Sequence, residues 1–264
     1  MSRFKRLFNN IQQRPAKIPF LMLGDPNPEL SLAAINALIQ GGADALELGF
    51  PFSDPIADGP IIQQAASRAS KQGVTTSCCF DIIKKIRERY DLPIGLLVYA
   101  NLVFYQGTDA FYQTAHAAGI DAILIPDVPV QEALPFVQAA KQHHISPILM
   151  ATPSCSEQTL LELAQYCEDY TYVVTRSGVT GNTQQCKFDE ARAIALKLTT
   201  VNAPPAVFGF GIQSALDVQK AYMAGAKGVI IGSTLIHTIA QMTPQEILDG
   251  SKIIALMQSL YQKL

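Results

Sequence analysis

The stretch LELGFPFSDPIADGP, residues 46–60, joins a buried strand to an acidic loop. The large apolar residues of its strand are Leu46, Leu48 and Phe50. Because side chains alternate between the two faces of a strand, these residues face one side and Glu47 faces the other. Two further acids, Asp54 and Asp58, follow in a loop that contains three prolines. The stretch predicts a strand with a carboxylate on its inner face and more carboxylates beyond its end.

Similar apolar runs recur along the chain, and helix-period stretches separate them. The eight expected strands are residues 18–24, 45–50, 93–100, 121–127, 146–152, 170–178, 204–212 and 227–233. Strand–helix alternation at this length is typical of a (β/α)8 TIM barrel, which takes roughly 250 residues. A doubly wound open sheet shares the alternation, but GFGIQS (209–214) lacks the third glycine of the dinucleotide fingerprint GxGxxG. The sequence favours a single α/β barrel domain spanning residues 1–264.

Helix signals surround the expected strands. In SLAAINALIQGG (31–42), a stripe of apolar residues precedes two glycines that stop a helix. The stripe consists of Leu32, Ile35, Leu38 and Ile39. Ser156 is expected to cap another helix. An additional N-terminal helix is expected from the spacing of Phe4, Leu7, Phe8 and Ile11, and an extra C-terminal helix after Pro244. We expect both to cover the ends or sides of the barrel.

The overall composition excludes several classes of protein. A net charge of −2 gives no reason to expect nucleic acid or an anionic membrane as partner. No apolar run approaches the roughly 20 residues of a membrane span, and the N-terminus has no signal-peptide core. The five cysteines form no CxxC pair, and the histidines show no metal-ligand spacing. We expect a soluble cytoplasmic protein without a metal site.

Glu47 is the strongest catalytic candidate from the residues alone. A carboxylate inside a barrel is costly unless paired or neutral, and burial raises its pKa toward the range useful for proton transfer. The alternative is a structural glutamate held by hydrogen bonds. Asp58 lies on the loop after the second strand, at the face where barrels place active sites, and we expect it to face Glu47. For Asp54, Ser-Asp-Pro favours a turn residue over a third acid.

Glycine turns follow the last three expected strands. Backbone N–H groups in such turns approach anions closely, and barrels often hold phosphate there. The phosphate-binding candidates are Gly181, Gly211, Gly232 and Ser233. Aromatic residues lie on four of the expected strands, at Phe20, Tyr99, Tyr172 and Phe210. Those that face the barrel mouth would suit a flat aromatic substrate, and the others would belong to the core.

With these motifs in place, the chain resembles the tryptophan synthase alpha chain family. LELGFPFSDPIADGP reads like the family signature, and further segments match in the right order along nearly the whole chain. They are PFLMLGDP (19–26), YANLVF (99–104), DVP (127–129), RSGVTG (176–181), GFGI (209–212) and IGS (231–233). The resemblance implies a (β/α)8 barrel, in agreement with the strand count.

The resemblance also implies an activity and roles for residues. The reaction is the retro-aldol cleavage of indole-3-glycerol phosphate to indole and glyceraldehyde 3-phosphate. Glu47 becomes the acid at indole C3 and the base for the C3′ hydroxyl proton, while Asp58 binds the indole N–H. The implied indole pocket is Phe20, Leu97, Tyr99, Leu124, Tyr172 and Phe210. The implied phosphate site is Gly181, Phe210, Gly211, Gly232 and Ser233. Thr180 would order Asp58 on loop closure.

By the same resemblance the chain works in an alpha2beta2 complex. The beta chain carries pyridoxal phosphate and receives the indole, so this chain needs no cofactor of its own. The residues expected to face the beta chain are Pro51, Asp54 and Asn101. The chain departs from the family pattern at Thr175, Gln213 and the segment GNTQQCKF (181–188). These departures concern loop closure rather than the chemistry. Two alternatives stay open: another barrel enzyme acting on a phosphorylated metabolite, and a non-catalytic subunit that activates a partner.

Overall fold

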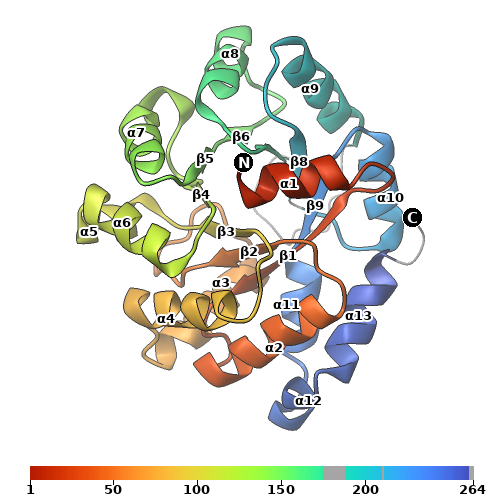
Figure 1. Cartoon of the computed structure of the whole chain (residues 1–264). Coiled ribbons are helices and arrows are strands. Elements are labelled where there is room, and N and C mark those ends of the chain that lie inside the picture. The colour runs from red at the N-terminus through yellow and green to blue at the C-terminus, as the bar shows by residue number, and fades with distance from the viewer. Residues whose placement is uncertain (175–187, 210, 262–264) are drawn as a thin grey trace.

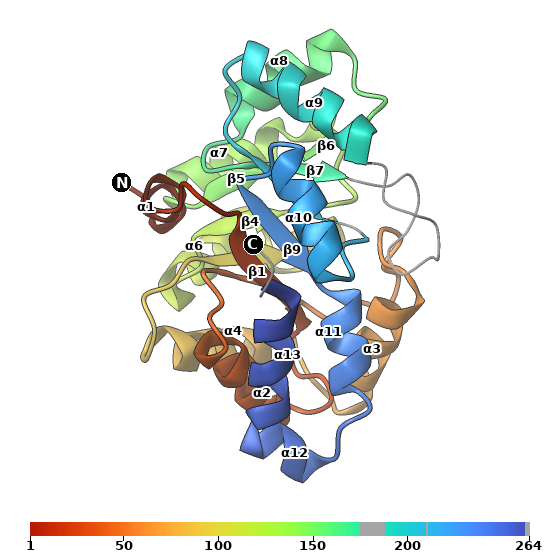
Figure 2. The same ribbon diagram turned by 90° about the vertical axis from the view of Figure 1, so that its right-hand side faces the viewer.

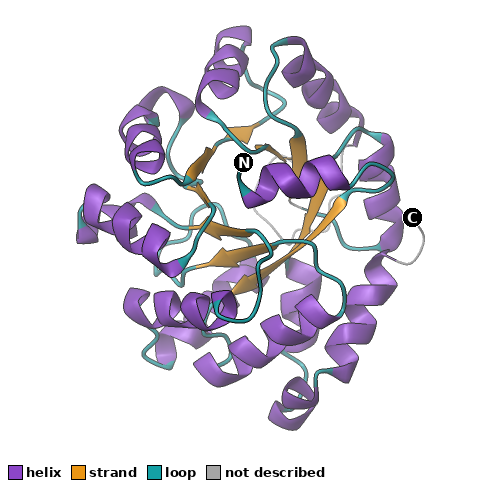
Figure 3. Ribbon diagram, in the orientation of Figure 1, coloured by secondary structure: helices purple, strands orange, loops and turns teal. Residues whose placement is uncertain are grey.

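A computed structural model of the chain describes residues 1–174, 188–209 and 211–261. Its strands form one parallel sheet that curls into a barrel, with helices around the outside (Figures 1 and 3). The strands are β1 (Ala16–Met22), β2 (Leu46–Gly49), β3 (Ile94–Leu97), β4 (Ala122–Leu124), β5 (Ser146–Ile148), β6 (Met150–Ala151), β7 (Thr171–Val174), β8 (Ala206–Gly209) and β9 (Gly228–Ile231).

The sheet runs in the order β5-β4-β3-β2-β1-β9-β8-β7-β6, and every pair is parallel. The two ends of this order, β5 and β6, are consecutive in the chain and are separated only by Leu149. The Leu149 carbonyl still accepts a hydrogen bond from the Tyr172 N–H at 3.1 Å. The expected barrel is therefore confirmed, and the fifth expected strand appears as two segments because it changes partner at Leu149.

Helices follow the strands around the ring, and Figure 2 shows them from the side. They are α1 (Arg3–Asn10), α2 (Pro28–Gln40), α3 (Pro60–Lys71), α4 (Thr76–Arg87), α5 (Ala100–Gln106), α6 (Thr108–Ala118), α7 (Leu134–Gln142), α8 (Glu157–Tyr166), α9 (Phe188–Thr200), α10 (Ala215–Met223), α11 (Ser233–Ile239), α12 (Pro244–Asp249) and α13 (Ser251–Tyr261), with a 3-10 turn at Val130–Glu132. None of the described helices has both the length and the apolar composition that crossing a bilayer requires.

The expected N-terminal helix is α1, and it lies across one end of the barrel (Figures 1 and 2). Its Phe4 is fully buried, and the Phe4 ring centroid lies 5.1 Å from that of Tyr170, just before β7. The helix therefore covers the amino ends of the strands and leaves their carboxyl ends free for a site. The expected C-terminal helix is also present, as α12 and α13, which pack on the outer helix α2.

Two helix expectations had different outcomes. Ser156 caps α8 as expected, because its side chain accepts a hydrogen bond from the Thr159 N–H at 3.1 Å. In α2 the expected stripe is confirmed in part: Ile35 and Leu38 are buried, but Leu32 and Ile39 are only half-buried. The small residues Ala34 and Ala37 are buried as well. Small side chains on that face allow the close approach of α12 and α13, which the apolar pattern alone does not reveal.

Candidate active site

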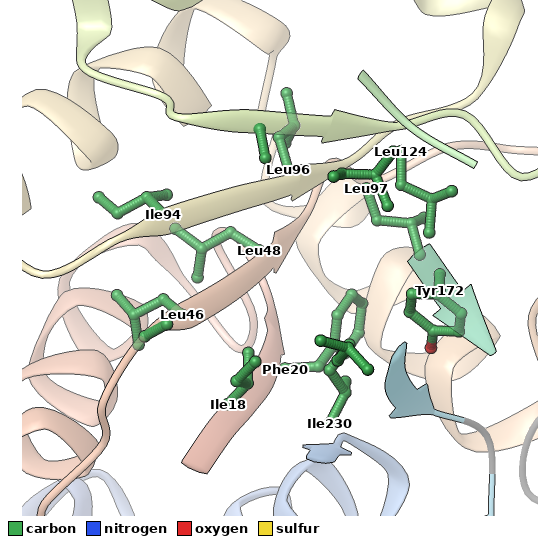
Figure 4. Packing of buried hydrophobic residues seen from close by; sticks show 14 of the residues in the cluster. Ile18, Phe20, Leu46, Leu48, Ile94, Leu96, Leu97, Leu124, Tyr172 and Ile230 are labelled. Carbon is green, nitrogen blue, oxygen red and sulfur yellow. The ribbon is translucent and has the colours of Figure 1, made fainter. Parts of the chain in front are cut away.

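A cavity opens among the carboxyl ends of the strands, and it brings together residues far apart in the sequence. Its volume is about 500 Å³, including the space at its open mouth. Both predicted acids, Glu47 and Asp58, line it. The other predicted residues on its wall are Phe20, Leu97, Tyr172, Gly211, Gly232 and Ser233. Figure 4 shows the apolar part of this wall, with Phe20, Tyr172 and Ile230 coming from β1, β7 and β9.

Glu47 points into the barrel from the middle of β2, between Phe20 of β1 and Gly95 of β3. Gly95 has no side chain to fill the adjoining space. Gly49, the next inward position of β2, could not carry one, because a Cβ there would lie 2.7 Å from the Phe20 ring. The Glu47 side chain is therefore buried yet reaches the cavity. Among the described residues, one of its carboxylate oxygens has no hydrogen-bond partner.

Burial decides the protonation state of Glu47. It disfavours the charged carboxylate and, with a smaller contribution from the nearby Asp58, raises the pKa of Glu47 to about 8. The group therefore holds a proton at neutral pH and can release it to a bound molecule.

Asp58 reaches the same cavity from the loop between β2 and α3. Its N–H donates to the Pro55 carbonyl at 3.0 Å, and its own carbonyl accepts from the Gln63 side chain at 2.8 Å. Burial raises the pKa of Asp58 to about 6, while a hydrogen bond from the Tyr99 hydroxyl acts in the opposite direction. Asp58 is therefore mainly ionised at neutral pH. The two acids present one proton donor and one anion to the same space.

The glycine turns after β8 and β9 form the opposite wall. Gly211 has a φ of +92°, a conformation that favours glycine, and Gly232 caps the N-terminus of α11. The Thr234 hydroxyl donates to the Gln213 carbonyl at 3.5 Å and so links the two turns. Backbone N–H groups and the Ser233 hydroxyl in such turns are suited to an anion. Three predicted residues, Thr180, Gly181 and Phe210, lie outside the described residues.

Two predicted pocket residues do not line the cavity. Leu124 is buried at the end of β4, paired in register with Leu97, and so stands one strand further along the wall. Tyr99 follows β3 and contacts the loop that carries Asp58 rather than the cavity itself. Tyr172 lines the cavity and also packs against the end of β8, where a Cβ on Gly209 would lie 1.9 Å from its hydroxyl.

Four further residues line the cavity without having been predicted: Ile62, Ile212, Gln213 and Ile230. Strand alternation could have found Ile230, because it shares a face of β9 with Gly228 and lies two residues before Gly232. Ile62 comes from the first turn of α3, and its inward direction depends on how that helix docks. The turn after β8 likewise has no periodicity from which Ile212 and Gln213 could be recognised.

The three residues expected to face a partner lie away from the cavity wall. Asp54 and Asn101 are exposed, and Pro51 is half-buried. Asp54 accepts a hydrogen bond from the neighbouring Ser53 hydroxyl and directly precedes the turn that the Asp58 N–H closes onto the Pro55 carbonyl. In the described part of the chain, no group of three or more histidine, cysteine or acidic residues is placed to hold a metal ion.

Comparison with known proteins gives consistent matches over most of the chain. The family model described as tryptophan synthase alpha chain matches residues 7–263. The tryptophan synthase alpha chain of Shewanella oneidensis is 50% identical over 249 residues, which cover 93% of this chain and 89% of that protein. A structure of Mycobacterium tuberculosis tryptophan synthase is similar with a TM-score of 0.87 at 28% identity, covering 99% of this chain and 97% of the other. A tryptophan synthase complex from Pyrococcus furiosus gives a TM-score of 0.82 at 29% identity, covering 94% and 98%.

Proposed function

The chain belongs to the tryptophan synthase alpha chain family, and from this premise we propose how its residues perform the reaction. It is the alpha subunit, a lyase that cleaves indole-3-glycerol phosphate to indole and glyceraldehyde 3-phosphate. The observation that carries the proposed residue roles is the meeting of Glu47 and Asp58 in one buried cavity. A protonated acid and an ionised acid in one apolar space are what this carbon–carbon cleavage needs.

Glu47 supplies the proton that starts the cleavage. With its pKa raised to about 8, it is protonated at neutral pH and donates to C3 of the indole ring. Protonated C3 no longer belongs to an aromatic system, so the ring accepts the electron pair of the C3–C3′ bond as that bond breaks. The C3′ hydroxyl becomes the aldehyde carbonyl, and its proton goes to the Glu47 carboxylate. The acid is thereby regenerated, and no net proton is consumed.

Asp58 stabilises the charge that this proton creates. Protonation at C3 places positive charge on the indole nitrogen, and the N–H becomes a stronger hydrogen-bond donor. An ionised carboxylate that accepts this hydrogen bond stabilises the transition state, and the burial of Asp58 strengthens the interaction. The pKa of about 6 keeps Asp58 in the form this role requires. Glu47 therefore donates the proton and Asp58 stabilises the positive charge, because their environments give them different pKa values.

The remaining cavity residues hold the two ends of the substrate. Phe20, Leu97 and Tyr172 offer a flat apolar space for the indole ring. We assign Phe210 to the same pocket. Leu124 supports this wall from β4. At the other end Gly211, Gly232 and Ser233 offer backbone N–H groups and a hydroxyl to the phosphate, and Gly181 and Phe210 complete that site. We assign Thr180 to the ordering of Asp58 when the substrate binds.

The partner of the chain is the tryptophan synthase beta chain. We propose an alpha2beta2 complex in which Pro51, Asp54 and Asn101 face that partner. Pyridoxal phosphate belongs to the beta chain, which takes up the indole, and no cofactor chemistry is assigned to this chain. We place the protein in the cytoplasm and treat residues 1–264 as one barrel domain.

The test is indole release from indole-3-glycerol phosphate by the variant Glu47→Gln. The amide has nearly the shape of the acid but no proton of suitable acidity, so activity should fall about 10³-fold, within the range of general acid–base catalysis. Binding of glyceraldehyde 3-phosphate should persist, because the phosphate site is separate. Glu162→Gln, on α8 and away from the cavity, is the matched control and should retain full activity. Normal turnover by Glu47→Gln would remove Glu47 from its assigned role.

A further inference from the structure

We propose that Tyr99 is a positioning residue for Asp58. Tyr99 holds the loop between β2 and α3 at two points and ties this loop to the start of α5. The inference rests on the proposed function, since it concerns how one of the two acids is held. It assigns Tyr99 to the acid loop rather than to the indole pocket.

Tyr99 contacts the loop between β2 and α3 at two separate places. Its ring stacks on that of Phe52, with centroids 5.2 Å apart and planes inclined by 22°. Its hydroxyl oxygen accepts a hydrogen bond from the Ala57 N–H at 3.2 Å. Phe52 lies near the beginning of the loop and Ala57 directly precedes Asp58. One side chain therefore fixes both the entry to the loop and the residue next to the acid.

Tyr99 is itself held firmly by the barrel. It is 1% exposed, and it lies between the end of β3 and the first residue of α5. The Val98 N–H before it donates to the Leu124 carbonyl at 3.1 Å. The Ala100 N–H after it donates to both carboxylate oxygens of Asp127, at 3.0 and 3.3 Å. The backbone on either side is thus anchored to the β4 region, so Tyr99 provides a fixed reference for the loop.

The same hydroxyl acts on the carboxylate of Asp58. It hydrogen-bonds Asp58 and favours the ionised form, against the burial that raises the pKa of that acid. The other titratable groups that interact with Asp58 are Glu47 on β2 and Tyr172 on β7. Both are uncharged at neutral pH, because burial raises their pKa values as well. The phenol is therefore the polar contact in the described structure that favours the charge on Asp58.

The variant Tyr99→Phe tests this role, because it removes the hydroxyl and keeps the ring that stacks on Phe52. We expect kcat for indole release to fall about tenfold, as for a lost hydrogen bond to a charged group, with KM changing less than twofold. The low-pH limb of the kcat/KM profile should move to higher pH, since Asp58 loses a contact that favours its ionised form. The Ala57 amide should exchange its hydrogen faster.

Tyr112→Phe is the matched control. Tyr112 is also a buried tyrosine, but it lies on α6, away from the cavity, and its variant should keep the wild-type rate, pH profile and loop protection. An unchanged pH limb in Tyr99→Phe, together with unchanged exchange at Ala57, would overturn the inference. Failure of the wild-type protein to release indole would instead overturn the proposed function, while hydrogen exchange would still report on the loop contact.

Discussion

At the scale of single residues, the proposed site is built on two carboxyl groups whose surroundings separate their pKa values. Glu47 comes from the middle of a strand and Asp58 from a loop, and both are buried in one cavity. Strand alternation was enough to predict that Glu47 points inward. The sequence could not give the difference in pKa, because that depends on how far the loop folds over the barrel and on the contact with Tyr99.

The first residue-scale prediction concerns pH. The proposed mechanism requires Asp58 ionised and Glu47 protonated, so kcat/KM for indole release should rise through a pKa of about 6 and fall through one of about 8. The raised pKa of Glu47 sets the alkaline limb, because the acid loses its catalytic proton as the pH increases. The measurement is a pH–rate profile with purified protein. The pH profile of the residual Glu47→Gln activity should lack the alkaline limb. An alkaline limb that persists in this variant would contradict the assignment of that limb to Glu47.

At the scale of elements, hydrophobic patterns predicted which segments are strands and helices better than they predicted how the segments pack. The apolar run 146–152 was recognised as a strand, but its division into β5 and β6 at Leu149 depends on a change of neighbour. In α2 the expected stripe was only partly right, because Ile35 and Leu38 are buried whereas Leu32 and Ile39 are half-buried. Packing against distant segments decides both features, and no local pattern encodes it.

The element-scale prediction concerns α1. Phe4 is fully buried against Phe8 and Tyr170, so Phe4→Ala should leave a cavity at the amino end of the barrel. We expect a loss of about 3–5 kcal/mol in the free energy of unfolding, measured by urea denaturation. Phe104→Ala is the control, because that ring is 59% exposed and its loss should cost less than about 1 kcal/mol. If Phe4→Ala lowers the free energy of unfolding no more than the small loss expected of the control, α1 does not stabilise the barrel.

At the scale of the whole molecule, the closed ring brings residues from both halves of the chain to one cavity. The barrel, its extra helices and the two acids could be predicted because each follows from periodicity or from a specific signature. The contributions of Ile62, Ile212 and Gln213 could not, because they depend on how helices and turns dock at the mouth. The residues in 175–187 and Phe210, which lie outside the described parts, remain predictions.

The whole-molecule prediction concerns the partner. The chain alone should release indole slowly, and addition of the beta chain should stimulate it strongly, since two of the proposed partner-facing residues, Pro51 and Asp54, lie on the loop that carries Asp58. The measurement is indole release with and without the beta chain under the same conditions. The beta chain should not restore activity to Glu47→Gln, which serves as the control. Equal wild-type rates in both conditions would contradict the proposed coupling.

The break at Leu149 divides the chain in a way that also divides the proposed chemistry. Glu47, Asp58 and Tyr99 precede it, whereas Gly211, Gly232 and Ser233 follow it. The residues proposed for proton transfer and those proposed for phosphate binding thus lie in different parts of the chain. Substitutions on the later side can alter which phosphorylated molecule is retained while the acids stay intact.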